Sequence, residues 1–451
     1  MKVRIPVLVK DPEVARWKDV PMFEDFVIDG EDVFLDGPVG RRVAVLDFDP
    51  QSGQLAPCAR YVPPAAVDGV GRFAFKNGST LDDPTFVQAV VFGGVHKTLA
   101  MFEESDALGR RVRWAFDGPQ LLVVPRAGDW ANAFYERESR SLQFFYFTPS
   151  GRPAPVYTAH SQDIIAHETT HAIIDGVLPD LYDAASPQAL ALHESIADFS
   201  TLLMSFRSRK LAARILEQTG GSIERSTAFT GVAEQFGMAL DASRHALREL
   251  NNDKSLADAG LDRSEPHDLS EILSGALYRV MVRMYDEIRS GASTESPTPH
   301  SVATDSEVEQ WRQSDDPNAQ RLPGFGAAGT TSAGKALFVA GERLKRTVIR
   351  GLDYLPPGEV TFADYGRAVV ASDKASHPDS PGQREALVAE FVKRAMADGP
   401  NALDVQTNYE NPLVYGVDLA SLMESDWYAY QFAERARSLL GIPKGVPFEI
   451  R

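Results

Sequence analysis

The spacing of apolar residues changes along the chain and predicts two kinds of structure. Residues 1–80 are rich in Val, Pro, Gly and Asp and carry only short apolar runs, which predicts irregular β structure. Apolar residues at helical spacing predict a helix over 84–104, whereas LLVV at 121–124 and LQFFYF at 142–147 predict strands. We therefore expect a β-rich N-terminal subdomain over residues 1–160.

From Ser161 onward the pattern is mainly helical. Ser161 is a typical N-cap residue, and the helix that it begins should end near Gly176. Ser186 followed by Pro187 is typical of a second helix start, and a third helix should follow Pro266. The other predicted helices are 337–352, 361–372, 382–398 and roughly 417–440.

Two stretches depart from this helical pattern. Residues 290–336 are rich in Ser, Thr, Pro, Gly and Asp and are predicted to form a long loop or insertion. Residues 399–451 are predicted to be a C-terminal extension. We therefore predict an α+β fold with a β-rich subdomain at 1–160, a mainly helical subdomain at 161–398 and this extension.

The composition narrows the range of partners. A chain of 451 residues with 43% hydrophobic residues can bury a large core. Its formal net charge of −17 argues against a nucleic-acid partner, because phosphates require a basic surface. The single cysteine, Cys58, excludes an intramolecular disulfide and a cysteine-based zinc site. The sequence predicts no oligomeric state.

The first residues bear on the location of the protein. Their apolar run ends at Lys10 and Asp11 and is too short for the core of a signal peptide. No later stretch is expected to approach the length and apolarity of a membrane span. A cytoplasmic protein without membrane contact is therefore predicted, and export by a route without such a signal stays open.

The candidate chemistry lies in the segment DIIAHETTHAII, which contains His-Glu-x-x-His at His167, Glu168 and His171. Residues four apart on a helix share a face, so both imidazoles can bind one metal ion. Glu168 lies one step round the helix, beside the position where a metal-bound water would lie. Zinc acidifies such a water, and a neighbouring carboxylate can take its proton as the water attacks a carbonyl. A chance match to this pattern is expected in roughly one chain in a hundred.

The next predicted helix offers a third ligand. Glu194 and Asp198, in LHESIADF, are four residues apart and share a face. Two imidazoles and one carboxylate make up a catalytic zinc site, so we predict His167, His171 and Glu194 as the metal ligands. Asp198 is predicted to accept the second ring N–H of a ligating histidine. The alternative, a solvated acidic face, fits poorly with the apolar residues that flank the pair.

These residues resemble the thermolysin family of zinc metallopeptidases, which are gluzincins with an HExxH…ExxxD pattern. The family has a tyrosine eleven positions after the second zinc histidine, here Tyr182, and the stretch HDLSEILSGALY matches its later His-x-x-Ser segment at His267. Asp262, five residues before His267, matches an aspartate that orients this histidine. The resemblance implies a thermolysin-like fold with the zinc site in a cleft between the two subdomains. It also implies that Tyr182 and His267 donate hydrogen bonds to the developing oxyanion.

The resemblance extends to substrate binding. The family's edge strand opens with Asn-Ala-Phe-aromatic, and this chain has Asn132 and Ala133 followed by two aromatic residues. Arg248, in HALRELNN, matches a substrate-binding arginine. The resemblance implies that a peptide adds as a strand along Asn132 and Ala133 while Arg248 binds one of its carbonyls. It covers about residues 70–290 and 337–398.

Several features depart from the family pattern. His193 precedes the predicted glutamate ligand where asparagine is usual, and we interpret it as a hydrogen-bonding neighbour rather than a fourth ligand. Only 131 residues precede Asn132, which leaves no room for the inhibitory leader of secreted members. The insertion at 290–336 and the tail after residue 398 have no counterpart.

The sequence also predicts that calcium is not required. Asp163 matches an aspartate that helps to bind calcium in the family, but calcium needs six to eight oxygen ligands. The stretch after Asp198, FSTLLMSFRSRKLAARILEQ, has no Asp, only Glu217, and several basic residues. Asp163 is better explained as a favourable charge at a helix N-terminus. We predict one zinc ion per chain and no calcium.

The predicted function is a zinc-dependent endopeptidase that acts on peptide or protein substrates. One alternative is an exopeptidase on the same fold, which would need a group that binds a free chain terminus. Another is a non-catalytic metal- or peptide-binding module, which would not need Glu168, Tyr182 and His267. The segment GTTSAGKA at 329–336 nearly matches a phosphate-binding loop, but Ala336 replaces the hydroxyl that would bind magnesium.

Overall fold

The structure is a computed structural model that describes most of the chain. The residues outside the described part are 51, 67–68, 152, 226, 242, 291–332, 378–380, 406–416, 419–420, 423–424 and 451. Most of the predicted insertion and the start of GTTSAGKA therefore lie outside the described residues. The chain forms two units, Met1–Asp404 and Val405–Arg451. The prediction of a mixed α+β protein is confirmed at that coarse level.

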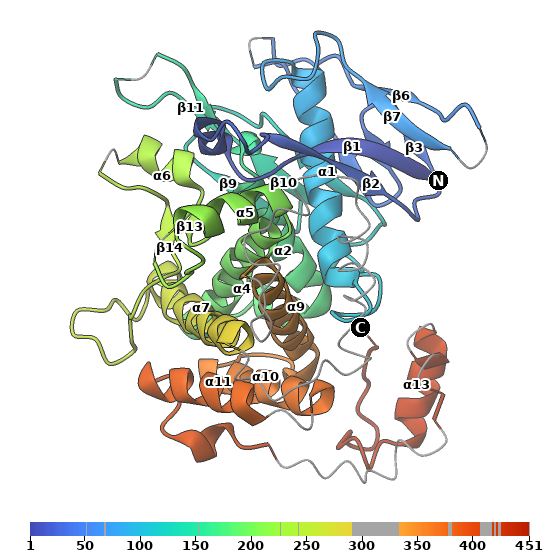
Figure 1. Cartoon of the computed structure of the whole chain (residues 1–451). Coiled ribbons are helices and arrows are strands. Elements are labelled where there is room, and N and C mark those ends of the chain that lie inside the picture. Colours follow the sequence, from blue (N-terminus) through green and yellow to red (C-terminus); the bar gives the residue numbers. More distant parts are fainter. Residues whose placement is uncertain are drawn as a thin grey trace. The chain divides into compact units, whose positions relative to one another are not determined.

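Short strands form two main sheets in the first unit (Figure 1). One sheet has the order β2-β1-β7-β6 and the other has the order β3-β4-β5-β8-β10-β9, while β11-β12 and β13-β14 form two small pairs. The strand bounds are β1 Lys2–Leu8, β2 Phe23–Ile28, β3 Phe34–Leu35, β4 Val39–Gly40, β5 Val43–Val45, β6 Arg60–Val62, β7 Val70–Ala74, β8 Leu121–Val124, β9 Ala133–Glu136, β10 Ser141–Phe144, β11 Tyr146–Phe147, β12 Val156–Tyr157, β13 Gly231–Val232 and β14 Arg248–Glu249. The strand predicted at 121–124 is confirmed, and the run at 142–147 divides between β10 and β11.

Strand β9 lies at the end of the larger sheet. It pairs antiparallel with β10, from Ala133 opposite Phe144 to Glu136 opposite Ser141. Because β9 is the last strand in the sheet order, its other edge has no strand partner among the described residues. An edge of this kind presents backbone N–H and C=O groups with which an extended peptide can pair.

Helix α1, Pro84–Glu103, packs between β1 and helix α2. Two adjacent glycines bring these elements close to it. A Cβ on Gly93 would lie 2.8 Å from Cγ1 of Val7 in β1, and a Cβ on Gly94 would lie 2.8 Å from Cγ2 of Ile165 in α2. The predicted helix at 84–104 is therefore confirmed, and its glycines serve close packing.

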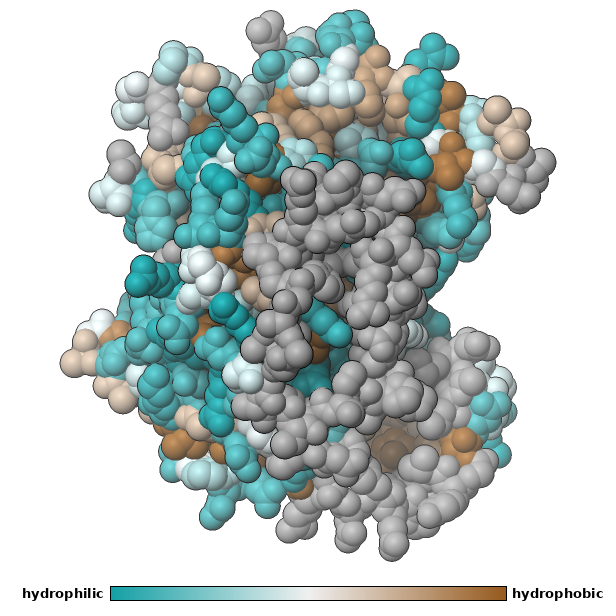
Figure 2. All heavy atoms as spheres, in the orientation of Figure 1, coloured by the Kyte–Doolittle hydropathy of each residue, from teal (hydrophilic) through white to brown (hydrophobic). Residues whose placement is uncertain are grey.

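The same helix corrects one expectation from the sequence. Among the described residues, α1 alone is long and apolar enough to cross a membrane, by length and composition. Its most apolar 18-residue stretch is 89% buried inside the protein, as expected of a core helix. Apolar residues on the face shown in Figure 2 occur in small patches among mainly hydrophilic ones. The absence of membrane contact stays a prediction.

Helices make up most of the first unit after Ser161 (Figure 1). Ser161 and Ser186 each accept a hydrogen bond from the backbone N–H three residues on, which confirms both capping predictions. Helices α2 and α4 pack against each other, and α7 packs against α4. The bounds are α2 Gln162–Val177, α3 Pro179–Tyr182, α4 Pro187–Phe206, α5 Arg209–Gln218, α6 Glu234–Leu240, α7 Pro266–Ser290, α9 Ala333–Gly351, α10 Phe362–Ser376, α11 Pro381–Lys393 and, in the second unit, α13 Asp426–Arg435.

Some helix predictions need correction. Helix α9 begins at Ala333, inside the stretch predicted as a loop, and α13 is shorter than the predicted span of 417–440. Helix α5 was not predicted, because only a narrow side of it is apolar and many of its other residues are charged. That side is buried and consists of Leu211, Ala212, Ile215 and Leu216.

Candidate metal and catalytic site

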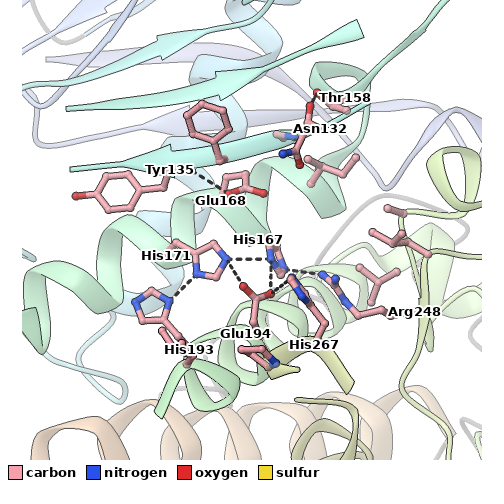
Figure 3. A pocket seen from close by; sticks show the side chains of 18 of the residues that line it. Asn132, Tyr135, Thr158, His167, Glu168, His171, His193, Glu194, Arg248 and His267 are labelled. Carbon is pink, nitrogen blue, oxygen red and sulfur yellow. Dashed lines mark hydrogen bonds and ion pairs between the residues drawn. The ribbon is translucent and has the colours of Figure 1, made fainter. Parts of the chain in front are cut away.

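The predicted metal ligands come from two packed helices (Figure 3). His167 and His171 lie on α2, and Glu194 lies on α4. The Nε2 atoms of the two histidines are 3.0 Å apart. Glu194 Oε2 lies 3.2 Å from His167 Nε2, and Glu194 Oε1 lies 3.5 Å from His171 Nε2. The structure therefore brings the three predicted ligands together.

The spacing of these groups fits a tetrahedral metal ion. Ligand atoms about 2.0–2.2 Å from a tetrahedral zinc ion lie roughly 3.3–3.6 Å from one another. The distances observed here are close to that range, although they involve both oxygens of Glu194: 3.0 Å between the two Nε2 atoms, 3.2 Å from His167 Nε2 to Oε2 and 3.5 Å from His171 Nε2 to Oε1. Glu194 Oε2 is also buried, and its nearest polar neighbours among the described residues are the Nε2 atoms of His167 at 3.2 Å and His267 at 3.6 Å. A cation would offset the free-energy cost of burying that oxygen.

Burial and neighbouring charges set the ionisation of the ligands. Burial lowers the pKa of His171 well below its ordinary value, so this ring is neutral and can bind a metal. Burial also disfavours charge on His167, but its hydrogen bonds to Asp198 and Glu194 outweigh burial and raise its pKa to about 10. A metal ion would replace that proton, because ligation requires an unprotonated nitrogen.

Asp198 lies behind His167. Its side chain is fully buried, and Oδ1 lies 3.0 Å from His167 Nδ1. Asp198 therefore contacts the ring nitrogen opposite to the one that faces Glu194 and His171. This contact places Asp198 where the sequence predicts it and fixes the orientation of the ring.

Arg248, on β14, binds the carboxylate of Asp198, a contact that the sequence did not predict. Its Nη2 and Nε each lie 2.6 Å from an oxygen of Asp198, and Nη2 lies 3.3 Å from His167 Nδ1. The buried Asp198 carboxylate thus binds two nitrogens of Arg248, and the binding of a substrate carbonyl by Arg248 stays a prediction. Arg248 still lines the cavity, and no protein acceptor is described for its Nη1.

His193 contacts the second ligating histidine. The Nδ1 atoms of His193 and His171 lie 2.6 Å apart, and the rings stack with centres 4.8 Å apart. Burial lowers the pKa of His193 to about 4, so the ring is neutral. Because it approaches Nδ1 of His171 while Nε2 faces the other ligands, His193 lies beside the metal site as a neighbour rather than a fourth ligand.

Glu168 links the predicted metal-binding helix α2 to the edge strand β9. Its Oε2 accepts a hydrogen bond of 3.1 Å from the backbone N–H of Tyr135 in β9. Burial raises the pKa of Glu168 to about 7. A carboxyl group with a pKa near neutral is suited to accept and return a proton.

A cavity of about 450 Å³ joins these groups. It is bounded by α2 and α4, by β9, and by the segments around β13 and β14 (Figure 3). The predicted site residues that line it are Asn132, Ala133, His167, Glu168, His171, Tyr182, Glu194, Arg248 and His267. The rest of the wall is largely apolar and includes Phe134, Leu181, Leu190, Val232, Phe236 and Leu247.

His267 lines this cavity but pairs with a carboxylate that was not predicted. Its Nδ1 lies 2.8 Å from Glu265, and its Nε2 lies 3.6 Å from Glu194. Asp262 instead accepts hydrogen bonds of 2.9 and 2.6 Å from the backbone N–H and the hydroxyl of Ser264. The prediction that Asp262 orients His267 is therefore wrong, because a local turn holds the Asp262 carboxylate.

Asp163, in the first turn of α2, has a buried partner. Lys10 Nζ lies 2.6 Å from Asp163 Oδ2 and 2.8 Å from the carbonyl of Gly231, and both side chains are almost fully buried. The backbone N–H of Ala233, in the cavity wall, also donates to Asp163 at 3.0 Å. The interpretation of Asp163 as only a helix N-terminal charge is therefore incomplete.

We expect the thermal stability of the protein not to depend on calcium. The Lys10 ammonium already neutralises Asp163, and a calcium ion would have to displace this buried charge. Melting temperatures measured in millimolar calcium and in a calcium-selective chelator that spares zinc should agree within about 2 °C, a small fraction of the shift that one tightly bound ligand produces. A fall of many degrees in the chelator would contradict the prediction.

A second group of carboxylates already holds cations. Glu104, Asp106 and Glu342 lie close enough to share an ion. The ammonium of Lys345 contacts all three, and Arg207 contacts Glu104 and Glu342. This group is therefore an ion-pair network rather than a metal candidate.

Besides the contacts of Arg248 and Glu168 described above, three contacts near the site were not predicted. They are Glu265–His267, Lys10–Asp163 and Arg137–Tyr182, whose members are 2, 153 and 45 residues apart in sequence. Only the first has a local signal, an acidic residue shortly before a histidine at a helix start. The other two depend on the tertiary fold.

Comparison with known proteins adds no relative. No protein-family model matches the chain, and no curated protein sequence matches it. The functional argument therefore rests on the residues of the site.

Proposed function

We propose that this protein is a zinc-dependent endopeptidase that hydrolyses bonds within peptide or protein substrates. The observation that carries the proposal is the convergence of His167, His171 and Glu194 with Glu168 on one cavity beside the edge of β9. A structural zinc site has four protein ligands, whereas a catalytic one has three and leaves a position for water or substrate. Three ligands beside a cavity match the catalytic kind.

Glu168 is the proposed general base. Bound zinc would supply an acidified water and polarise the scissile carbonyl. One oxygen of Glu168 is held by the Tyr135 N–H, which leaves the other to accept the proton of the water and to return it to the leaving amine. The resulting carboxylic acid is accessible near neutral pH because burial raises the pKa of Glu168 to about 7.

His267 and Tyr182 are the proposed hydrogen-bond donors to the oxyanion. Both line the cavity, on α7 and α3 respectively. Glu265 lies 2.8 Å from Nδ1 of His267 and so orients the ring, whose Nε2 lies 3.6 Å from Glu194.

The edge of β9 is the proposed binding strand for substrate. Asn132 and Ala133 lie where β9 enters the cavity wall, and extended peptides bind to free strand edges through backbone hydrogen bonds. Arg248 Nη1 is the nitrogen left to bind a peptide carbonyl, since Nε and Nη2 bind Asp198.

The test of the function is a cleavage profile on a peptide library. Zinc-loaded protein should cut within peptides, lose the activity with a zinc chelator and regain it when zinc is restored. Release of single terminal residues alone would instead indicate an exopeptidase. Tight peptide binding without cleavage would indicate a non-catalytic module.

Variants around His267 test its role and the unexpected partner. His267→Ala should lower kcat by roughly 10²–10³, the usual cost of losing one oxyanion donor. Glu265→Gln should lower kcat about tenfold because it weakens the contact that orients the ring, whereas Asp262→Asn should stay near the wild-type rate. Steady-state kinetics on one library peptide measure all three. A larger loss in Asp262→Asn than in Glu265→Gln would show that the predicted partner is right and the observed one is not.

A further inference from the structure

Arg137 follows the edge strand β9 and joins the segments that surround Tyr182. Its Nε and Nη2 bind the carboxylate of Asp175, on α2, at 2.5–3.1 Å. Nη2 also donates to the carbonyl of Pro179 at 2.8 Å, and Nη1 donates to Asp183 at 2.7 Å. The guanidinium is therefore held by the predicted metal-binding helix and by the short helix α3, which ends at Tyr182.

The same guanidinium covers one face of the Tyr182 ring. Arg137 Cζ lies 4.4 Å from the ring centre. Tyr135 meets the ring edge-on, with centres 5.6 Å apart and an angle of 74° between the planes. A planar arginine over an aromatic face is a favourable cation–π contact. Tyr182 is thus held on one face and along one edge in the cavity wall.

The hydroxyl of Tyr182 also contacts Arg137. The backbone N–H of Arg137 donates to Tyr182 Oη in a long hydrogen bond of 3.5 Å. A phenol oxygen that accepts a hydrogen bond still has its own proton to donate. The Arg137 guanidinium therefore restricts the plane of the Tyr182 ring, and the Arg137 backbone N–H restricts the direction in which the Tyr182 hydroxyl can donate its proton.

Asp175 holds the Arg137 guanidinium in a fixed position. Its side chain is fully buried and also accepts a hydrogen bond of 2.6 Å from the hydroxyl of Tyr135. The hydrogen bonds to Asp175 raise the pKa of Arg137, so the guanidinium stays charged. A lysine would bring the charge but neither the paired hydrogen bonds nor the flat stacking surface.

We propose that Arg137 is a positioning residue that fixes Tyr182 as a hydrogen-bond donor to the transition state of peptide hydrolysis. The inference rests on the proposed function. It assigns to Arg137 an effect on the chemical step and none on the affinity for the substrate, because its side chain contacts Tyr182 and not the edge of β9 that receives the peptide.

The test is a double-mutant cycle in the zinc-loaded full-length protein. Arg137→Met should lower kcat about tenfold, with KM within twofold of wild type, because a misplaced donor weakens only the transition state. Tyr182→Phe removes the donor and should cost roughly 10²–10³. The double variant should be no slower than Tyr182→Phe, since the position of the ring no longer matters once its hydroxyl is gone. Arg140→Met, the same change on an exposed turn, should match wild type.

Two further measurements separate positioning from a merely structural role. Affinity for a phosphonate peptide that mimics the tetrahedral state, measured by calorimetry, should fall with kcat in Arg137→Met. Arg137→Lys keeps a charge beside Asp175, so it should fold and bind zinc normally, yet it should still show a reduced kcat and the same coupling to Tyr182→Phe.

The outcomes distinguish this inference from the proposed function. If the losses in kcat multiply in the double variant, or if only KM changes, the proposed role of Arg137 is wrong but the proposed peptidase function is unaffected. A wild-type rate in Tyr182→Phe would also overturn the role of Arg137 and leave the proposed function intact. A wild-type protein that cuts no peptide with zinc bound would overturn the function and this inference together.

Discussion

Glu168→Gln is expected to keep zinc and to lose peptide hydrolysis by several orders of magnitude, toward about 10⁴-fold. The amide has nearly the shape of the carboxylate and can still accept the Tyr135 N–H hydrogen bond, but it cannot take a proton from water. The three ligands are untouched by the change. Hydrolysis of one library peptide, measured together with bound zinc by elemental analysis, gives both results.

The matched control is Glu138→Gln, which makes the same change at an exposed residue beyond β9 and should hydrolyse peptides like wild type. If Glu168→Gln cleaves peptides at the wild-type rate with normal zinc content, then Glu168 is not the base. A variant that loses zinc would instead mean that Glu168 supports the ligands.

The second large effect is expected for His171→Ala. Wild-type protein should hold about one zinc ion per chain, and the variant should lose most of it, because two remaining ligands do not make a tight site. Peptide hydrolysis should fall with the zinc content. Elemental analysis after dialysis measures the loss, and His245→Ala, at a side chain that is 74% exposed, is the control. Full zinc in His171→Ala would remove His171 from the ligand set.

The parts of the fold that sequence predicts best are those with local causes. Ser161 and Ser186 cap their helices where the sequence places them, because a capping side chain bonds to a backbone group only three residues away. His167 and His171 share a helical face by spacing alone. The prediction of Glu194 as a ligand also required the next helix to pack against the helix that carries the two histidines. Helix α4 does pack against α2.

The contacts of the site that the sequence did not predict are those in which several donors compete for one carboxylate. Asp262 and Glu265 both precede His267, and spacing alone cannot show that Ser264 takes the Asp262 carboxylate. Arg248 was assigned only to substrate because the burial of Asp198, which binds two of its nitrogens, is a property of the folded chain. A carboxylate with several donors in reach binds the one that geometry favours, and that geometry belongs to the tertiary structure.

The pairing of Lys10 with Asp163 and Gly231 has a consequence for the order in which the protein is made. The partners lie 153 and 221 residues after Lys10, so during synthesis its ammonium has no place to be buried until more than half of the chain has been translated. The cavity wall at Ala233 depends on the same cluster, through its hydrogen bond to Asp163. The cleft is therefore completed late, when the first strand, the predicted metal-binding helix and the segment around residue 231 come together. A ribosome-bound chain that ends before this segment should carry the His-Glu-x-x-His helix without a complete cleft, so the peptidase activity that we propose should be absent while the chain is being synthesised.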